Sequence, residues 1–513
     1  MTEEKNKALR SIFHGGAILF VGVLLSKIFG LLFRILVGRS LGPVEYGIIA
    51  VMMSAFSLMT TFGHLGIHRG VHRYVAYYRG ERSDKSVLFT VRSGYLMILL
   101  PSLVVSIGVF VLSPWISTVL LDEERLIWPL RMAAVALPFW GIAKVSIGIT
   151  NAFEKMQYKV YVKKIWVNFT EVILAFVLIY AGYNYLGAAF AYAFGFLTSA
   201  FLGLYFAYKV YPDLFSMKDA SYHTGELWQH SWPLFAAGVF AFITGHIDTF
   251  MLQYFDGSES VGLYQAAYPF AILLLASNSI FNSIFLSRAS YLTSKDSKEL
   301  NSIFKTVVSW TAIITIPVFL LLFAYPRGAL ILFGSEFLEV DNILRVLLIG
   351  FLLQTVINPA QKVYQAVDKT RIVTILSVLL AIFNFSLNLI LIPIYGIMGA
   401  AIASTAAFAL IFLVKIVYIY KILGSQPFQL SAVKALLAGI LTISIIYGVS
   451  SLLFEVVPEW FLLVAFALFT GIYPVIFIAM GGVTENDLVI LREIDEKTSI
   501  DLSPLKKIFK KLN

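Results

Sequence analysis

The sequence predicts an all-α polytopic membrane protein of about fourteen transmembrane helices, built as two six-helix repeats around a central cavity with two more helices after them. Composition is the first observation: 59% of the 513 residues are hydrophobic and 13% are charged, against roughly 45–50% and 25% in soluble domains. Apolar runs of about 20 residues, the length that crosses a bilayer, recur along the chain. Short motifs also recur at a nearly constant offset. Together these features exclude an ordinary soluble enzyme.

Charged or turn-forming residues separate the apolar stretches from one another. The first stretch is longer than the ~7–15 residues of a signal-peptide core and contains Lys27 and Arg34, so we expect it to remain as a membrane helix. The fourteen predicted spans lie near residues 12 to 37, 44 to 66, 87 to 112, 126 to 150, 161 to 183, 186 to 210, 231 to 254, 259 to 286, 303 to 325, 341 to 365, 372 to 393, 396 to 422, 430 to 454 and 459 to 481.

The charges between these spans alternate along the chain. Basic residues gather before the first span, at 69–85 and at 155–164, whereas the intervening loops are acidic, as in Asp122-Glu123-Glu124. Because cytoplasmic loops carry excess Lys and Arg, this alternation predicts a plasma-membrane protein with both termini in the cytoplasm. The net charge of +9 is then explained by the loops, without a nucleic-acid partner. The absence of Cys removes disulfides and Cys-ligated metals.

Two halves of the sequence repeat each other. Residues 42–47 (GPVEYG) return as 257–262 (GSESVG), an offset of 215 (257 − 42). Residues 151–155 (NAFEK) return as 365–369 (QAVDK), an offset of 214 (365 − 151). The matches of 168–170 with 384–386 and of 187–189 with 399–401 have offsets of 216 (384 − 168) and 212 (399 − 187). Such duplication is typical of transporters in which two helix sets move about a central site.

The repeat also gives a domain organisation. Six spans precede the second copy, so both copies have the same orientation in the membrane. We therefore expect an N-lobe over residues 1–222, a C-lobe over 223–425, two appended helices within 426–481 and a cytoplasmic tail over 482–513. The tail is either an amphipathic helix on anionic lipid or a solvated segment.

With these motifs in view, nearly the whole chain resembles the polysaccharide and oligosaccharide flippases of the multidrug/oligosaccharidyl-lipid/polysaccharide (MATE-like) exporter superfamily. The resemblance rests on residues 39–47, on Asp248 with 261–264, and on 384–405, which includes NLILIPIYGIMGAA. It implies two bundles of six helices around a V-shaped cavity and alternating access. It also implies movement of an isoprenoid-linked sugar from the cytoplasmic to the outer leaflet.

Cations inside predicted spans are the first candidates for binding a sugar-lipid phosphate. Lys27 and Arg34 stand seven residues apart, nearly two helical turns, and so share one face. A central charge costs roughly 2.5–3.5 kcal/mol on insertion scales and usually faces a cavity, although Arg34 could instead anchor the helix at the headgroups. Lys144 is a third cavity cation or a residue whose ammonium reaches the cytoplasmic interface.

A second group of candidates lies at the predicted inner ends of the spans. His68, Arg69 and Arg73, with Arg288 at the matching place in the repeat, form either a basic mouth that attracts phosphate or an ordinary positive loop. His64, His68 and His72 have helical spacing, but the interleaved arginines disfavour a metal. Asn278 and Asn282 either line the cavity and bind sugar hydroxyls or hydrogen-bond between helices.

Two acidic residues lie inside predicted spans. Asp248 falls close to the repeat equivalent of Arg34, so it is either an inter-lobe ion-pair partner, a site for a coupling sodium ion or proton, or a structural cap. Glu171, near Asn168, is either an ion-coupling group or a carboxylate hydrogen-bonded to its neighbours.

The function that the sequence favours is a flippase for lipid-linked oligosaccharide, with that lipid and the surrounding membrane lipids as its partners. The alternative is a cation-coupled multidrug exporter of the same superfamily. An enzyme is not expected, because no extramembrane domain or catalytic carboxylate cluster is evident. No GxxxxGK[ST] motif occurs, so ATP hydrolysis at a P-loop is excluded. We expect no cofactor beyond a coupling ion, and a monomer.

Overall fold

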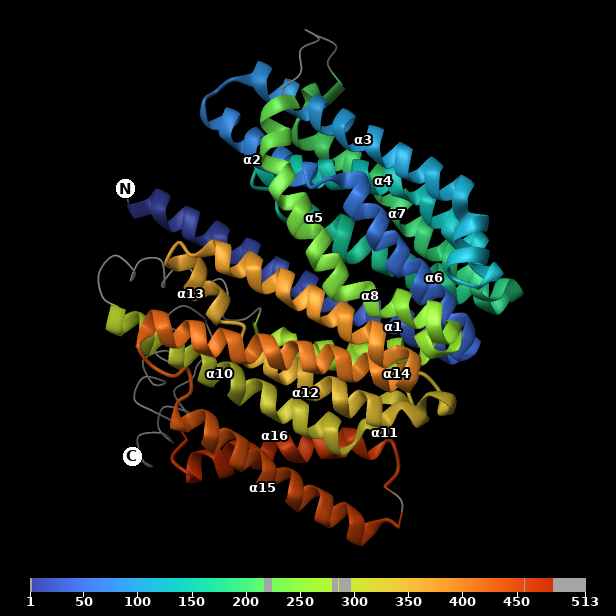
Figure 1. The fold of residues 1–513 in the computed structure, drawn as a ribbon. Coiled ribbons are helices and arrows are strands. Elements are labelled where there is room, and N and C mark those ends of the chain that lie inside the picture. The colour runs from blue at the N-terminus through green and yellow to red at the C-terminus, as the bar shows by residue number, and fades with distance from the viewer. Residues whose placement is uncertain (1, 216–223, 279–284, 286–296, 456, 483–513) are drawn as a thin grey trace. The chain divides into compact units, whose positions relative to one another are not determined.

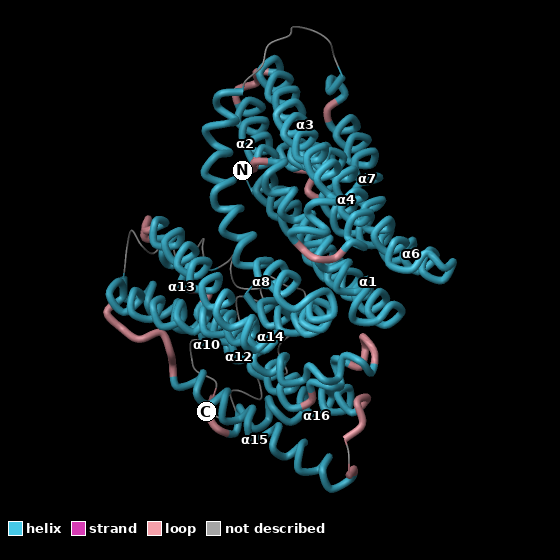
Figure 2. The backbone as a smooth tube through the Cα atoms, turned by 45° about the vertical axis from the view of Figure 1, so that its right-hand side comes forward, coloured by secondary structure: helices cyan, strands magenta, loops and turns pink. Residues whose placement is uncertain are grey.

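A computed structural model of the chain describes residues 2–215, 224–278, 285, 297–455 and 457–482. In the first helix, side chains are described continuously from Leu25. The described residues form helices that are connected by short loops (Figure 2). The predicted all-helical class is confirmed.

The chain divides into two compact units, residues 1–265 and 266–513, each of which is described here by itself. The expected lobe boundary at 222/223 stays a prediction; the division by contacts places the first part of α8 with the preceding helices. The first unit contains α1 (Thr2–His64), α2 (Ile67–Gly80), α3 (Asp84–Trp115), the π-helix η1 (Ile116–Leu120), η2 (Glu124–Leu126), α4 (Ile127–Ala152), α5 (Gln157–Lys159), the π-helix η3 (Val160–Trp166), α6 (Val167–Leu178), the π-helix η4 (Ile179–Tyr183), α7 (Asn184–Val210), η5 (Pro212–Phe215) and most of α8 (Thr224–Ile272) (Figure 1).

The second unit holds the end of α8 and the remaining helices. They are η6 (Leu273–Leu275), α10 (Ser297–Ala324), α11 (Pro326–Leu330), η7 (Ser335–Val340), α12 (Asp341–Ile357), α13 (Ala360–Ala366), α14 (Thr370–Leu423), α15 (Leu430–Leu453) and α16 (Phe461–Ala479). The last two helices, predicted as an appendix, pack on α10. Tyr473 of α16 donates to the Ile313 carbonyl at 3.2 Å, and the apolar cluster there joins Ile316, Ala438 and Phe469.

Ten helices in the described residues are long and apolar enough to cross a membrane. Four of them, of 40 to 55 residues, would measure about 60–80 Å at 1.5 Å per residue. Each contains one glycine with non-helical backbone: Gly42, Gly182, Gly257 or Gly396. The chain therefore turns sharply within these continuous helical stretches.

The repeated motifs have repeated backbone conformations. Gly42 has φ 78° and ψ 178°, and Gly257 has φ 85° and ψ −179°, a region that essentially only glycine occupies. Glu154 and Asp368, the fourth residues of the NAFEK and QAVDK motifs, both have positive φ, 61° and 56°. Asn184 (φ 46°, ψ −137°) likewise matches Gly396 (φ 54°, ψ −131°). The duplication predicted from the sequence is thus present in the local structure of both copies.

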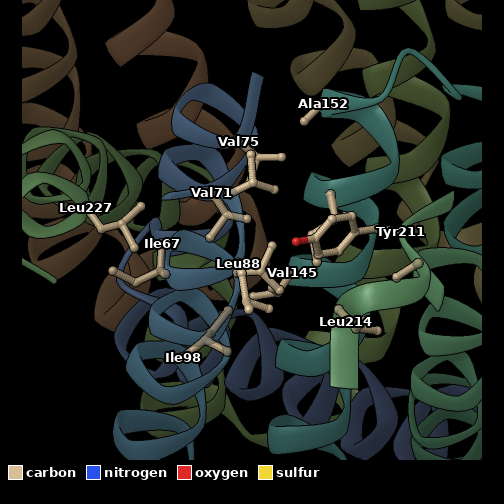
Figure 3. Close-up of a cluster of buried hydrophobic side chains, with 14 residues drawn as sticks. Ile67, Val71, Val75, Leu88, Ile98, Val145, Ala152, Tyr211, Leu214 and Leu227 are labelled. Atoms are coloured by element: carbon tan, nitrogen blue, oxygen red, sulfur yellow. The ribbon is translucent and has the colours of Figure 1, made fainter. Parts of the chain in front are cut away.

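A dry apolar cluster holds the short helix α2 in place. Ile67, Val71 and Val75, at spacings of four, belong to one buried cluster with Leu88 of α3, Val145 of α4 and Leu227 of α8 (Figure 3). This spacing puts them on one helical face. The opposite face of α2 carries its basic residues, so burial of the apolar stripe fixes where those charges lie.

Candidate functional site

The exposed face of α2 begins a group of basic side chains in the first unit. Arg69, His72 and Arg73 are exposed, and Arg73 lies 2.9 Å from His230 of α8. Arg69 lies close enough to Lys144 of α4 for their charges to interact. The structure therefore brings together Arg69 and Lys144, two of the residues singled out in the sequence.

Lysines of the π-helix η3 extend this group of basic side chains. Lys163 in η3 lies near Lys144, and both ammonium groups lie against the ring of Trp140, at 5.5 Å for Lys144 and 5.8 Å for Lys163. Lys164 lies near Lys27 of α1. The lysines of η3 were counted in the sequence only as loop charge; the four-residue spacing of Lys159 and Lys163 is the signal that could have found them.

We call these side chains the basic cluster: Lys27, Arg69, Lys144, Lys159, Lys163 and Lys164. None of the six forms an ion pair within the described part of the chain. Like charges this close repel one another and favour an anion between them. The cluster is therefore an arrangement of uncompensated positive charge in which four residues, Lys27, Lys144, Lys163 and Lys164, fall within predicted membrane spans.

Two histidines border the basic cluster with buried, unsatisfied ring atoms. His64 Nε2 donates to the Leu137 carbonyl at 3.3 Å, which leaves Nδ1 as the unprotonated atom, and that atom has no partner. His68 Nδ1 is also buried, and no described residue hydrogen-bonds to it. Burial, followed by the charges of Lys144, Arg69, Lys163 and Lys159, holds the pKa of His68 well below its usual range. His68 is therefore neutral at pH 7. No group of three metal-ligating side chains occurs in the described residues.

At the opposite end of the same helices, the two glycine motifs pack against each other. A Cβ added to Gly47 would collide with the Ser258 carbonyl oxygen, and one added to Gly262 would collide with the Pro43 carbonyl oxygen. The two collisions are equivalent under the repeat offset of 215, so α1 and α8 approach each other through a local two-fold arrangement. We call this contact, between residues 43–47 and 258–262, the glycine crossing.

Arg34 lies near the glycine crossing rather than in the basic cluster. Its Nη1 donates to Gln265 Oε1 at 3.2 Å and lies 3.4 Å from the Tyr46 hydroxyl. Tyr46 donates in turn to the Gln265 carbonyl at 3.0 Å. Asp248 accepts a hydrogen bond from Tyr264 at 2.8 Å. Arg34 thus has amide and phenol partners, and its pairing with Asp248 stays a prediction.

A loop of the first unit closes over the kink in α8. Glu123 Oε2 accepts from Ser258 Oγ at 3.0 Å and pairs with Arg125 at 2.8 Å. Gln253 Nε2 donates to the Leu121 carbonyl at 3.0 Å. The charges of Glu123 and Arg125 therefore compensate each other, in contrast to those of the basic cluster.

The remaining candidates are dispersed. Glu171 of α6 is buried beside Gly195, within the electrostatic reach of Arg34. In the second unit Asn278 is buried, and neither of its amide atoms has a hydrogen-bond partner among the described residues. Asn282 and Arg288 lie outside the described residues.

Two protein families and several membrane proteins are similar to this chain. The family described as polysaccharide biosynthesis protein matches residues 12–291, and the MatE family matches residues 233–390. An uncharacterized membrane protein of Methanocaldococcus jannaschii is 22% identical over 464 residues, 86% of this chain and 90% of that protein. The probable low-salt glycan biosynthesis flippase of Haloferax volcanii is 25% identical over 44% of this chain and 50% of its own. The putative O-antigen transporter of Shigella flexneri is 21% identical over 71% of this chain and 87% of its own.

Solved structures agree on the fold. The lipid II flippase MurJ in an inward closed conformation superposes with a TM-score of 0.74 at 18% identity, covering 91% of this chain and 99% of that one. An inward-facing multidrug MATE transporter superposes with a TM-score of 0.64 at 14% identity, covering 80% and 98%. The fold is therefore that of MurJ and the MATE transporters. With more than half of its length matched by the family, this chain belongs to the polysaccharide biosynthesis and flippase family of the MATE-like superfamily, whose members are multi-pass membrane transporters and not enzymes.

Proposed function

We propose that this protein flips an oligosaccharide linked to isoprenoid phosphate or pyrophosphate from the cytoplasmic to the outer leaflet, for polysaccharide, cell-wall or glycoprotein synthesis. The basic cluster is the observation that carries the proposal. Lys27, Lys144 and Lys163 are cations at membrane helices without carboxylate partners in the described chain, and a phosphate headgroup supplies the missing negative charge. The names of the Haloferax and Shigella relatives point to the same class of substrate.

The broken helices support the predicted topology of fourteen spans. Each of the four long helices with an internal glycine break is long enough for two crossings of a ~30 Å core. Counting these four twice turns ten candidate spans into fourteen crossings. An even number puts both termini on one side, and the positive-inside rule makes that side the cytoplasm. The basic cluster then lies toward the cytoplasmic leaflet, where lipid-linked sugars would enter.

The transport cycle uses two six-helix lobes, 1–222 and 223–425, that alternate in access. The headgroup enters at His68, Arg69, Arg73 and the basic cluster. Arg34 receives it nearer the glycine crossing, which separates when the outward side opens. Asn278 and Asn282 line the sugar path, and Asp248 and Glu171 couple the cycle to a sodium ion or proton or act as gates. One monomer suffices, because both lobes lie in a single chain.

The test is flipping of a fluorescent lipid-pyrophosphate-linked oligosaccharide in proteoliposomes. We expect transport by the wild type and its collapse in Lys27→Ala and Arg34→Ala at equal reconstitution. Lys421→Ala is the matched control, because Lys421 is exposed and lies over Tyr418 in the second unit, at 5.9 Å. A wild type that moves no such lipid but exports cationic dyes under an ion gradient would replace the proposal with a multidrug exporter.

A further inference from the structure

A crevice of about 940 Å³ opens between α1 and the segment formed by α6 and η4. Residues 32–41 form one wall and residues 172–184 the other. Its volume is within the roughly 300–1,000 Å³ of known ligand sites. The whole crevice belongs to the first unit.

The crevice lies on the far side of α1 from the proposed headgroup path. Leu32, Leu36 and Arg39 line it at helical spacings of four and three. Arg34 is two residues beyond Leu32, which at 100° per residue puts it on the opposite face, and Lys27 shares that opposite face. A ligand in the crevice is therefore separate from the substrate of the proposed transport.

The chemistry of the crevice changes along its length. From Leu32 to Leu36, and along the facing side chains Ile173 and Phe176, the walls are apolar. The polar lining residues, Arg39, Ser40 and Asn184, gather at one end, beside the chain breaks at Gly42 and Gly182. Residues 32–41 rise about 14 Å, roughly half of a ~30 Å hydrocarbon core. The crevice thus has the depth and polarity of a single membrane leaflet.

Arg39 is available to a ligand at the polar end. The side chain is exposed and makes no hydrogen bond or ion pair with described residues. An arginine at the depth of the headgroups attracts anionic lipid. The guanidinium is also well shaped to bind two phosphate oxygens at once.

We propose that the crevice binds one anionic phospholipid of the surrounding leaflet, with an acyl chain along the apolar walls and its phosphate on Arg39. The separation from Lys27 and Arg34 favours a bilayer lipid over the transported isoprenoid. Because the lipid touches both walls, it stabilises the packing of α1 on α6. A ligand that binds only the folded protein raises the unfolding temperature.

The experiment measures phosphatidylglycerol binding to the full-length protein in detergent, by native mass spectrometry and by the shift in unfolding temperature. We expect one tightly retained phosphatidylglycerol, preferred over phosphatidylcholine. Arg39→Gln should weaken its apparent affinity about fivefold, the loss expected for one arginine at the headgroups. Ile173→Trp, which fills the apolar wall from a side chain that is 47% exposed, should abolish retention with Arg39 intact.

Arg327→Gln is the matched control, because Arg327 is an exposed arginine of the second unit that does not line the crevice; this variant should bind phosphatidylglycerol as the wild type does. Equal binding of phosphatidylglycerol by wild type and Arg39→Gln would overturn the proposal. Displacement of the retained lipid by isoprenyl phosphate at lower concentration than by phosphatidylglycerol would also overturn it, in favour of a substrate site. Both results are independent of whether the protein flips oligosaccharide.

Discussion

The basic cluster and the glycine crossing, both in the first unit, differ in whether their charges are paired. At the basic cluster, Lys144 and Lys163 share the ring of Trp140 and have no carboxylate partner in the described chain. At the glycine crossing, Arg125 is paired with Glu123, and backbone meets backbone without side chains between them. Uncompensated charge indicates a place for an anionic ligand, whereas compensated charge and close backbone packing indicate a closed contact. The same helices therefore carry a binding end and a sealing end.

The largest loss of transport should come from disrupting the glycine crossing. Gly262→Ala places a methyl group against the Pro43 carbonyl oxygen, and backbone, unlike a side-chain tip, cannot move aside cheaply. Overpacking of this kind costs about 1–3 kcal/mol or more, and because a crossing held apart cannot close the outward side, we expect transport to be abolished. Gly245→Ala, also in α8 but with open space where the added Cβ would lie, should transport normally.

The same variant can be examined without transport. The chain has no cysteine, so Ser258→Cys introduces a unique label at a side chain that is buried in the crossing. In the Gly262→Ala background a membrane-impermeant thiol reagent should modify this cysteine faster than in the parent. An unchanged labelling rate would show that the crossing tolerates the added methyl group.

The next effect concerns the basic cluster. Replacing Lys144 and Lys163 together with Ala removes two charges that a phosphate would contact, each charge-assisted hydrogen bond contributing about 1.5–3 kcal/mol. We expect flipping of a pyrophosphate-linked lipid to fall by more than tenfold while the unfolding temperature rises or stays constant, because mutual repulsion is relieved. A large loss of stability would instead assign both lysines to structure.

Much of this arrangement could be predicted from the sequence, because it depends on local signals. Hydropathy and loop charge gave the helical membrane class, and the glycine motifs gave the repeat whose backbone turns recur at Gly42 and Gly257. The reciprocal contact of Gly47 with Gly262 could not be predicted, because it depends on how distant helices cross.

The site was harder to predict for the same reason. Lys27 and Arg34 share a helical face, yet Lys27 joins Lys164 and Arg34 joins Gln265, because the polar groups of neighbouring helices decide each partner. A π-helix also shifts the direction of side chains such as Lys163 relative to α-helical spacing.

A smaller effect is expected on the pH dependence of stability, through His68 at the border of the basic cluster. His68 has a depressed pKa in the folded protein, so below about pH 6.5 the unfolded chain binds a proton that the folded chain does not. Stability should therefore fall as pH drops below 6.5, by at most about 1.4 kcal/mol per pH unit from this group. His68→Gln should show a shallower fall in unfolding temperature between pH 7.5 and 5.5. An identical slope in both proteins would show that His68 does not contribute.

The smallest effect is expected at the polar loop over the crossing. Ser258→Ala removes the hydroxyl whose single proton bonds to Glu123 Oε2 or Gln253 Oε1, a contribution of about 1–2 kcal/mol. We expect a severalfold change in transport and a slightly lower unfolding temperature. Ser451→Ala should leave both unchanged, because Ser451 is exposed and, among the described residues, its hydroxyl donates only to the Gly448 carbonyl of its own helix.

The central claim is that uncompensated charge at one end of the first unit serves a phosphate headgroup. Its most direct test compares, in the same proteoliposomes, flipping of one oligosaccharide carried on isoprenyl pyrophosphate, isoprenyl monophosphate or an uncharged isoprenyl ether. We expect the wild type to flip the pyrophosphate-linked lipid fastest and the monophosphate-linked lipid next, and we expect replacement of Lys144 and Lys163 with Ala to remove this preference. Equal rates for the charged and uncharged lipids in the wild type would contradict it.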